Sequence, residues 1–215
     1  MNLLGKMAMT VASKVALDAT KNAIVKASKK NRDKFFEKQP GTEILVISKN
    51  ELMNKDTFDV YDENREVKYN VKGNLTSIKH HLRIYDAKGN EIGMIKEQPV
   101  SMLEFLFCGA KSVDLIIEIN GKKRGKFTST WSFGKPEYEV DFNGWRIEKN
   151  IWGWEYKVLK GNREIAHISQ KVWYFDGTYG DTYVVAFPDI KNELIVLMLV
   201  LSLYVANQMR LREQN

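Results

Sequence analysis

The sequence predicts a mainly β protein, in which a closed antiparallel barrel of about twelve strands surrounds a central hydrophobic C-terminal helix and follows a basic N-terminal helix. Three observations lead to this fold class. Between residues 43 and 187, short runs rich in Ile, Val, Tyr, Phe and Trp alternate with turn residues. An apolar, uncharged run follows at 194–206. A segment rich in lysine and alanine precedes both.

The N-terminal segment is predicted to be helical because residues 3–34 contain no Pro, one Gly and many Ala, Lys and Met residues. Residues 1–39 hold 9 Lys and Arg against 3 Asp and Glu, whereas the rest of the chain is balanced. The net charge of +6 therefore resides in an arm. A domain boundary is expected near Pro40, which gives a basic arm at 1–39 and a barrel domain at 40–215.

The strand region contains turn residues at positions where tight hairpins need a positive φ, which Asn and Gly adopt at the least cost. The turns are predicted at 62–64, 89–90, 120–121, 143–144 and 161–162. Their uneven spacing indicates a meander of hairpins and no strict internal repeat.

The C-terminal helix is predicted at 189–208, with Asp189 as its N-cap directly after Pro188. Its uncharged part, 194–206, would span about 20 Å as a helix, whereas a bilayer core needs roughly 30 Å. No transmembrane span is therefore expected. The run is apolar on every side, so it must be enclosed, and a closed sheet is a structure that can enclose it.

Two stretches resemble a known family. "DTYVVAFPDIKNELIVLMLVLSLYVA" at 181–206 and the hairpin unit "LRIYDAKGNEIGMIKE" at 82–97 are similar to segments of LURP-one-related proteins. The same features are found in phospholipid scramblases, and both groups belong to the tubby-like C-terminal class. The resemblance covers roughly residues 43–208. It implies a twelve-stranded antiparallel barrel around a hydrophobic C-terminal helix.

Catalytic and cofactor sites find little support in the sequence. The only histidines are His80, His81 and His167, and the first two point to opposite faces of a strand. No Ser stands in a recognisable nucleophile setting, and Cys108 is the single cysteine, which excludes an internal disulfide. We therefore predict a non-enzymatic protein without a cofactor or a bound metal.

Calcium-dependent lipid handling is an alternative that the resemblance to scramblases raises, because those proteins carry an acidic loop before the terminal helix. The corresponding region offers Asp176, Asp181, Asp189 and Glu193. Calcium prefers six to eight oxygens from a compact loop, and these four residues are spread across a predicted strand. Asp189 fits a helix cap better than a calcium ligand.

Two basic clusters are candidate lipid or phosphate sites. The first lies around a predicted hairpin turn and consists of Lys122, Lys123, Arg124 and Lys126. Tubby-like domains bind phosphoinositides through such residues, so the resemblance implies the same role; a solvated turn is the alternative. The second lies in the N-terminal arm and consists of Lys14, Lys21, Lys26, Lys29, Lys30 and Arg32.

The arm has three possible partners. An anionic membrane would attract its lysines, although no Trp or Phe precedes Phe35 to anchor it in the interface. Its alanine ridge suits docking on the barrel or on a protein partner. Nucleic acid is disfavoured because stacking aromatics are missing from the arm before Phe35.

The function predicted from the sequence is a binding or scaffold module that recognises anionic phospholipid or phosphoinositide at a membrane surface. A protein interaction module that uses the N-terminal helix remains an alternative. No secretory signal is apparent, since Lys6 and Lys14 interrupt the early apolar residues. A cytoplasmic location, peripheral at the membrane, is expected.

Overall fold

The computed structural model describes residues 43–49, 57–64, 66–74, 81–98, 112–132, 135–149, 155–171 and 182–213. The predicted N-terminal helix and its cations lie outside these ranges, as does the boundary near Pro40. The described residues form twelve strands: β1 Glu43–Lys49, β2 Thr57–Tyr61, β3 Val67–Asn74, β4 His81–Asp86, β5 Glu91–Glu97, β6 Val113–Ile119, β7 Lys122–Ser132, β8 Lys135–Val140, β9 Trp145–Lys149, β10 Glu155–Lys160, β11 Arg163–Lys171 and β12 Thr182–Phe187.

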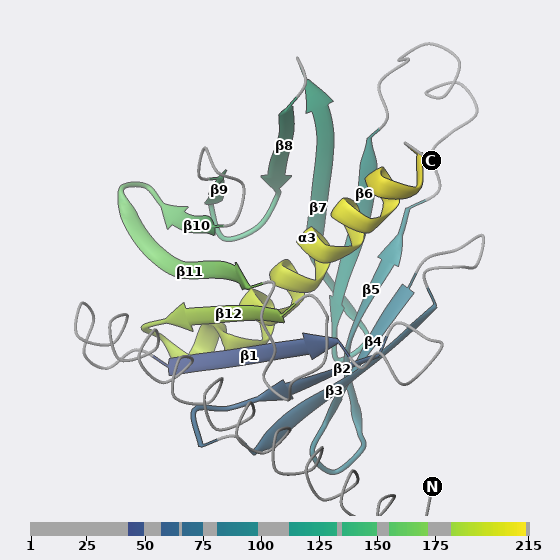
Figure 1. Ribbon diagram of the computed structural model, residues 1–215, viewed down its shortest axis with the longest axis vertical. Helices are drawn as coiled ribbons and strands as arrows, with labels where there is room; N and C mark the ends of the chain where they lie inside the picture. The colour runs from purple at the N-terminus through teal and green to yellow at the C-terminus, as the bar shows by residue number, and fades with distance from the viewer. Residues whose placement is uncertain are drawn as a thin grey trace, which may run out of the picture.

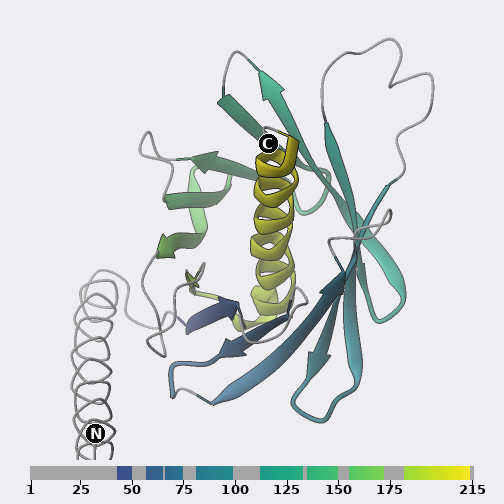
Figure 2. The same cartoon turned by 45° about the vertical axis from the view of Figure 1, so that its right-hand side comes forward.

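The strands build one antiparallel sheet with the order β8-β7-β6-β5-β4-β3-β2-β1-β12-β11-β10-β9. The sheet curves around a single long helix, α3 (Glu193–Glu213), which follows a 3-10 turn, η1 (Ile190–Asn192) (Figure 1). The turned view of Figure 2 shows strands on both sides of α3. The predicted mainly β class, the strand number and the C-terminal helix are confirmed.

The predicted closure of the barrel is not formed, because β8 and β9 are the two edges of the sheet and no described residues pair them. The linking residues instead bind to β7, since the Asp141 backbone N–H donates to the Lys126 carbonyl and its carboxylate accepts from the Lys126 N–H. Phe142 then turns inward and packs against Trp145, with ring centroids 5.8 Å apart. The contact between Phe142 and Trp145 takes the place of the hydrogen-bond ladder that would close the barrel. The sheet is therefore an open half-barrel.

Four of the five predicted turns contain a residue with positive φ, whereas residues 62–64, which the structure describes, do not. Asn120 has φ 50° and Gly121 φ 71° in the β6 to β7 turn, and Gly89 (φ 84°) and Gly161 (φ 58°) occupy two further hairpins. Asn143 and Gly144 also lie in a turn, but the strands that it joins do not form a hairpin ladder.

Helix α3 is enclosed, as its composition predicts. Every residue from Ile195 to Ala206 is at most 6% exposed, and Leu197 and Leu201 are at 0% and 1%. Ser202 is the one serine in this run, and its hydroxyl donates a hydrogen bond to the Met198 carbonyl at 2.8 Å, so this polar group is satisfied. The helix extends beyond the predicted end at 208, to Glu213.

Polar contacts hold both ends of the apolar helix segment. At its start, buried Glu193 accepts from Lys68 at 2.7 Å and from the Tyr69 hydroxyl at 2.6 Å, so the carboxylate joins α3 to β3. At its end, the side chain of Asn207 contacts the hydroxyls of Tyr138 and Tyr156 at 3.2 and 3.3 Å. These contacts fix where the helix lies along the sheet.

One described stretch, Ile190–Met209, is long and apolar enough to cross a membrane by length and composition. Most of it is buried inside the sheet, and the core helix of a domain passes the same test.

The hairpin between β4 and β5 predicts a specific dependence of stability on pH. The Asp86 carboxylate accepts from the side chain of Asn90 at 3.0 Å and from the backbone N–H groups of Asn90 and Lys88 at 2.8 and 2.9 Å. These bonds, with the Asn90 side chain first, lower the pKa of Asp86 below its ordinary value of 3.8. The stabilisation is therefore complete above pH 3.8 and is lost as the pH falls through the lowered pKa.

We expect Asp86→Asn to unfold at a lower urea concentration than the wild type at pH 7 and to approach it below pH 3.8. Urea titrations at both pH values measure this. An equal difference between the two proteins at both pH values would contradict the role of the charge.

Candidate functional site

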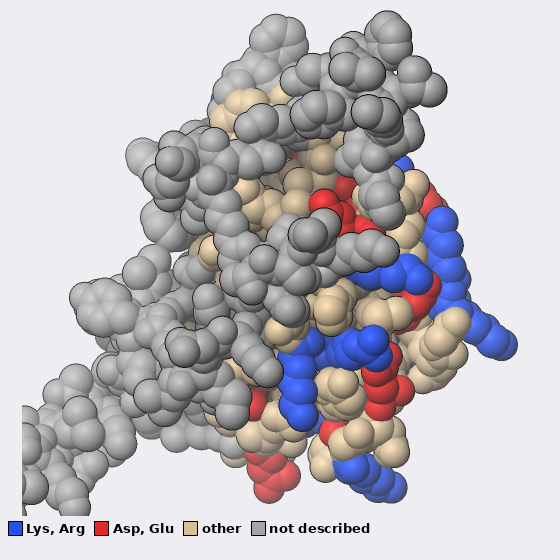
Figure 3. Space-filling view, turned by 90° about the vertical axis from the view of Figure 1, so that its right-hand side faces the viewer, with Lys and Arg blue, Asp and Glu red and all other residues tan. Residues whose placement is uncertain are grey.

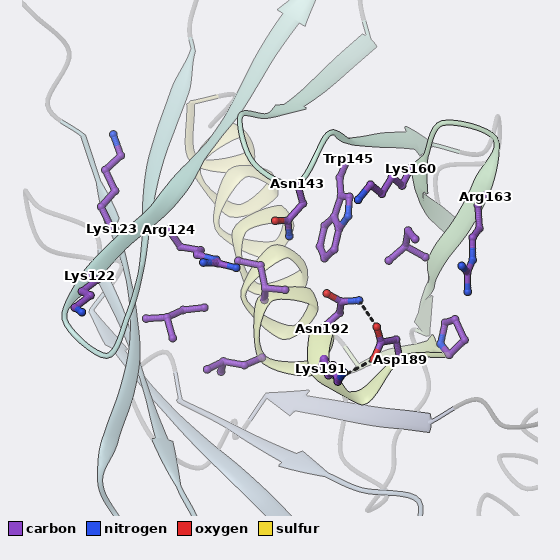
Figure 4. A pocket seen from close by; sticks show the side chains of 15 residues that line it. Lys122, Lys123, Arg124, Asn143, Trp145, Lys160, Arg163, Asp189, Lys191 and Asn192 are labelled. Atoms are coloured by element: carbon purple, nitrogen blue, oxygen red, sulfur yellow. Dashed lines mark hydrogen bonds between the residues drawn. The ribbon is translucent and has the colours of Figure 1, made fainter.

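A pocket of about 700 Å³ opens at one end of the sheet, next to the start of α3. Because the sheet is antiparallel, the turns after β6, β8 and β10 all lie at the end where β12 runs into η1. These three turns and η1 surround the pocket (Figure 4). Its lining comprises Ile119, Lys122, Lys123, Arg124, Asn143, Trp145, Lys160, Arg163, Ile165, Pro188, Asp189, Lys191, Asn192, Leu194 and Ile195.

The lining is strongly positive. Its six cationic side chains are Lys122, Lys123, Arg124, Lys160, Arg163 and Lys191. Within the described ranges none of them forms an ion pair. The one carboxylate, Asp189, accepts from the Lys191 backbone N–H at 3.0 Å and from the Asn192 side chain at 3.1 Å, as the N-cap of η1. Among the described residues, these cations therefore have no neutralising partner.

Two β-bulges shape the pocket walls. In the β6 and β7 pair, Ile117 faces Gly125 and Glu118 faces Lys123, which makes Arg124 the extra residue. In the β10 and β11 pair, Ile165 is the extra residue in the same way. A bulge redirects the side chain of its extra residue. Figure 4 shows Arg124 extending towards Asn143 and Trp145, with Lys160 reaching towards them from the opposite wall.

Trp145 lies between the two cationic walls. It is 6% exposed, and its ring packs edge-on against Phe142. The backbone N–H of Trp145 donates to the Phe142 carbonyl at 3.2 Å, which fixes the turn that carries Asn143. The aromatic contact that replaces barrel closure thus also builds the pocket floor. The arrangement offers an anion several charged donors above a rigid apolar base.

The structure divides the predicted cluster of four basic residues. Lys122, Lys123 and Arg124 line the pocket. Lys126 does not, because its amino group is 3.4 Å from the Asp114 carboxylate on the neighbouring strand. Figure 3 shows the outer surface of the sheet, where cationic and acidic side chains lie next to one another. Ion pairs on the sheet include Arg83 with Glu91, whose side chains are 2.7 Å apart.

Three cations of the pocket escaped the sequence prediction: Lys160, Arg163 and Lys191. They are separated from Lys122 by dozens of positions in the chain, and only the sheet order brings them close. One signal could have found them, since Lys160 and Arg163 flank a predicted tight turn that follows an even-numbered strand, as the Lys122 cluster does.

Of the four residues that raised the calcium alternative, the two that the structure describes have other partners. Asp189 caps η1, and Glu193 is bound to Lys68 and Tyr69. Asp176 and Asp181 lie outside the described residues, as do His80 and Cys108. Among the described residues, no group of three or more His, Cys, Asp or Glu side chains could hold a metal ion.

Comparison with known protein families places this architecture. The family model described as LURP-one-related matches residues 43–202, which include all twelve strands and most of the buried run of α3. The chain belongs to the LURP-one-related family. The resemblance of residues 82–97 and 181–206 to this family predicted the membership.

This LURP-one-related protein is similar to two further proteins, one by sequence and one by structure. The uncharacterized protein YxjI of Bacillus subtilis (strain 168) is 26% identical over 129 residues, which are 60% of this chain and 72% of that protein. An X-ray structure of a protein from Arabidopsis thaliana shares 12% sequence identity and a TM-score of 0.46, and the match covers 75% of this chain and 90% of that one.

Proposed function

We propose that this LURP-one-related protein is a non-enzymatic binding module whose cationic pocket receives a phosphate-bearing ligand, such as the headgroup of an anionic phospholipid or a phosphoinositide. One observation carries the proposal: six cationic side chains without ion-pair partners among the described residues surround a pocket of about 700 Å³. Elsewhere on the sheet, cations such as Arg83 and Lys126 are paired with carboxylates.

The chemistry of the lining suits a phosphate group. Arg124 can donate two parallel hydrogen bonds to one phosphate, and Lys160 on the facing wall adds a compact charge. Each lysine or arginine near an anionic surface contributes about 1 kcal/mol, so the six together contribute about 6 kcal/mol, which corresponds to a Kd on the order of tens of micromolar and weakens with added salt. Such a ligand would supply the missing negative charge.

The non-enzymatic part of the proposal rests on what lines the pocket. Its residues include no Ser, Cys or His that could serve as a nucleophile or a general base. The Asp189 carboxylate is occupied with capping η1. A relationship to tubby-like domains and scramblases, a cytoplasmic location at the membrane surface, and a role of the N-terminal arm in binding lipid or a protein partner belong to the same proposal.

The double variant Arg124→Glu/Lys160→Glu tests the pocket. We expect it to bind phosphatidylcholine vesicles that contain phosphatidylserine or phosphatidylinositol bisphosphate at least about 10-fold more weakly than the wild type, because two attractive charges become repulsive. Co-sedimentation measures this. Both residues are exposed, so the variant is expected to keep its melting temperature.

The matched control is Lys72→Glu/Lys135→Glu, which makes the same change of charge at two exposed positions that do not line the pocket and lie towards the other end of the sheet. At moderate salt, where the change in net charge has little effect on its own, the control should bind the vesicles as the wild type does. Equal binding by wild type and pocket variant contradicts the proposed function, and so does a wild type that binds neither an anionic vesicle nor a soluble phosphate headgroup.

A further inference from the structure

We propose that the turn end of the sheet docks on an anionic bilayer with Ile190 inserted into the interface, so that the pocket takes its phosphate from a lipid in that bilayer. The inference rests on the proposed function and adds to it a membrane-facing surface and an orientation. We define the docking surface as the pocket cations together with Pro188 and Ile190.

An exposed apolar side chain lies at the rim of the pocket. Ile190 is 56% exposed, and its neighbours Asp189 and Lys191 both line the pocket. Among the described residues only Val67 and Trp131 are comparable exposed large apolar side chains, and neither lines the pocket. The exposed ring of Pro188 stands beside it. An apolar tip among cations is the combination that binds membrane interfaces.

The turn that carries Ile190 is held in place. Asp189 accepts hydrogen bonds from the Lys191 N–H and from the Asn192 side chain, and the Asn192 N–H donates to the Asp189 carbonyl at 3.0 Å. Glu193 follows directly, buried and bound to Lys68. The outward position of Ile190 is therefore fixed before any contact with a membrane, and little entropy is lost on insertion.

The cations extend beyond the reach of one small ligand. Figure 4 shows the Lys123 side chain extending away from Trp145, while Arg124 extends towards it. Lys123 has no ion-pair partner among the described residues. A single soluble ligand held near Trp145 would leave Lys123 unused, whereas a bilayer presents further phosphates around the one in the pocket. This charge distribution favours a lipid surface over a free headgroup.

The test uses the full chain and two probes: vesicles of phosphatidylcholine with phosphatidylinositol bisphosphate, and the water-soluble headgroup inositol trisphosphate. We expect Ile190→Ser to lower vesicle binding about 5- to 10-fold, since roughly half of an isoleucine side chain no longer enters the interface. Calorimetric titration should show unchanged binding of the soluble headgroup. Val67→Ser is the matched control, because Val67 is 41% exposed and does not line the pocket.

Each outcome bears on a different claim. If Ile190→Ser binds vesicles as the wild type does, or if the wild type binds the soluble headgroup but no vesicle, docking through Ile190 is wrong while the phosphate pocket stands. If the wild type binds neither probe, the proposed function is wrong and the docking surface falls with it. If Val67→Ser loses vesicle binding as Ile190→Ser does, the assigned orientation is overturned.

Discussion

Replacing Leu201 by alanine should lower the free energy of unfolding by about 2–5 kcal/mol. Leu201 is 1% exposed in the middle of α3 and is surrounded by the concave side of the sheet. The change removes buried apolar surface and leaves a cavity that the strands cannot collapse to fill, because their spacing is set by hydrogen bonds around the helix. Urea denaturation followed by circular dichroism measures the loss.

The control is Leu194→Ala, the same chemical change in the same helix at a half-buried position. It should cost less than half as much as Leu201→Ala. Equal losses at the two positions would mean that the sheet does not enclose α3 as described, and that the helix owes its stability to its own propensity.

Gly125→Val should destabilise the protein by about 3 kcal/mol, at the upper end of the range for overpacked cores. A Cβ at Gly125 would collide with the Phe142 ring and would lie 2.7 Å from the Asp141 carboxylate. Both neighbours belong to the turn that binds to β7, so neither can move away without breaking the Asp141 bonds to Lys126. Thermal and urea unfolding measure the effect.

Gly93→Ala is a comparison within the same sheet. The closest contact of a Cβ there would be the flexible end of Met198, at 3.1 Å, and the Glu118 carbonyl would lie at an ordinary 3.5 Å, so a small shift of the Met198 side chain can relieve the contact. We expect a loss below about 1.5 kcal/mol. Because Gly125 follows Arg124, Gly125→Val should also weaken phosphate binding, whereas Gly93→Ala should not. The reverse ranking would contradict the packing at the β8 and β9 edges.

Local signals in the sequence account for much of the fold. Asn and Gly predicted the turns because positive φ is a property of single residues, and Asn120 and Gly121 adopt it. The uncharged run at 194–206 predicted an enclosed helix because its composition leaves no face for water. Helix length was underestimated at the C-terminal end, where polar residues continue the helix to Glu213 beyond the enclosed segment.

Closure and the pocket could not be predicted from local signals. Whether β8 pairs with β9 depends on Asp141 binding back to β7 and on Phe142 packing against Trp145, and these contacts arise only once the sheet has curved. The Lys122 cluster was visible as a run of charge. Its partnership with Lys160 depends on strand order and on a bulge at Arg124, which a single sequence does not reveal.

Helix α3 comes after all twelve strands along the chain, and this order has a consequence during synthesis. A ribosome delivers the strands first, each with one apolar face, and releases the segment that those faces cover only afterwards. Until then the apolar faces of the strands are exposed and the nascent chain must be kept soluble. We therefore expect it to be a substrate for holding chaperones. Maturation is therefore expected to occur in one late step, when the final helix emerges and the sheet can wrap it.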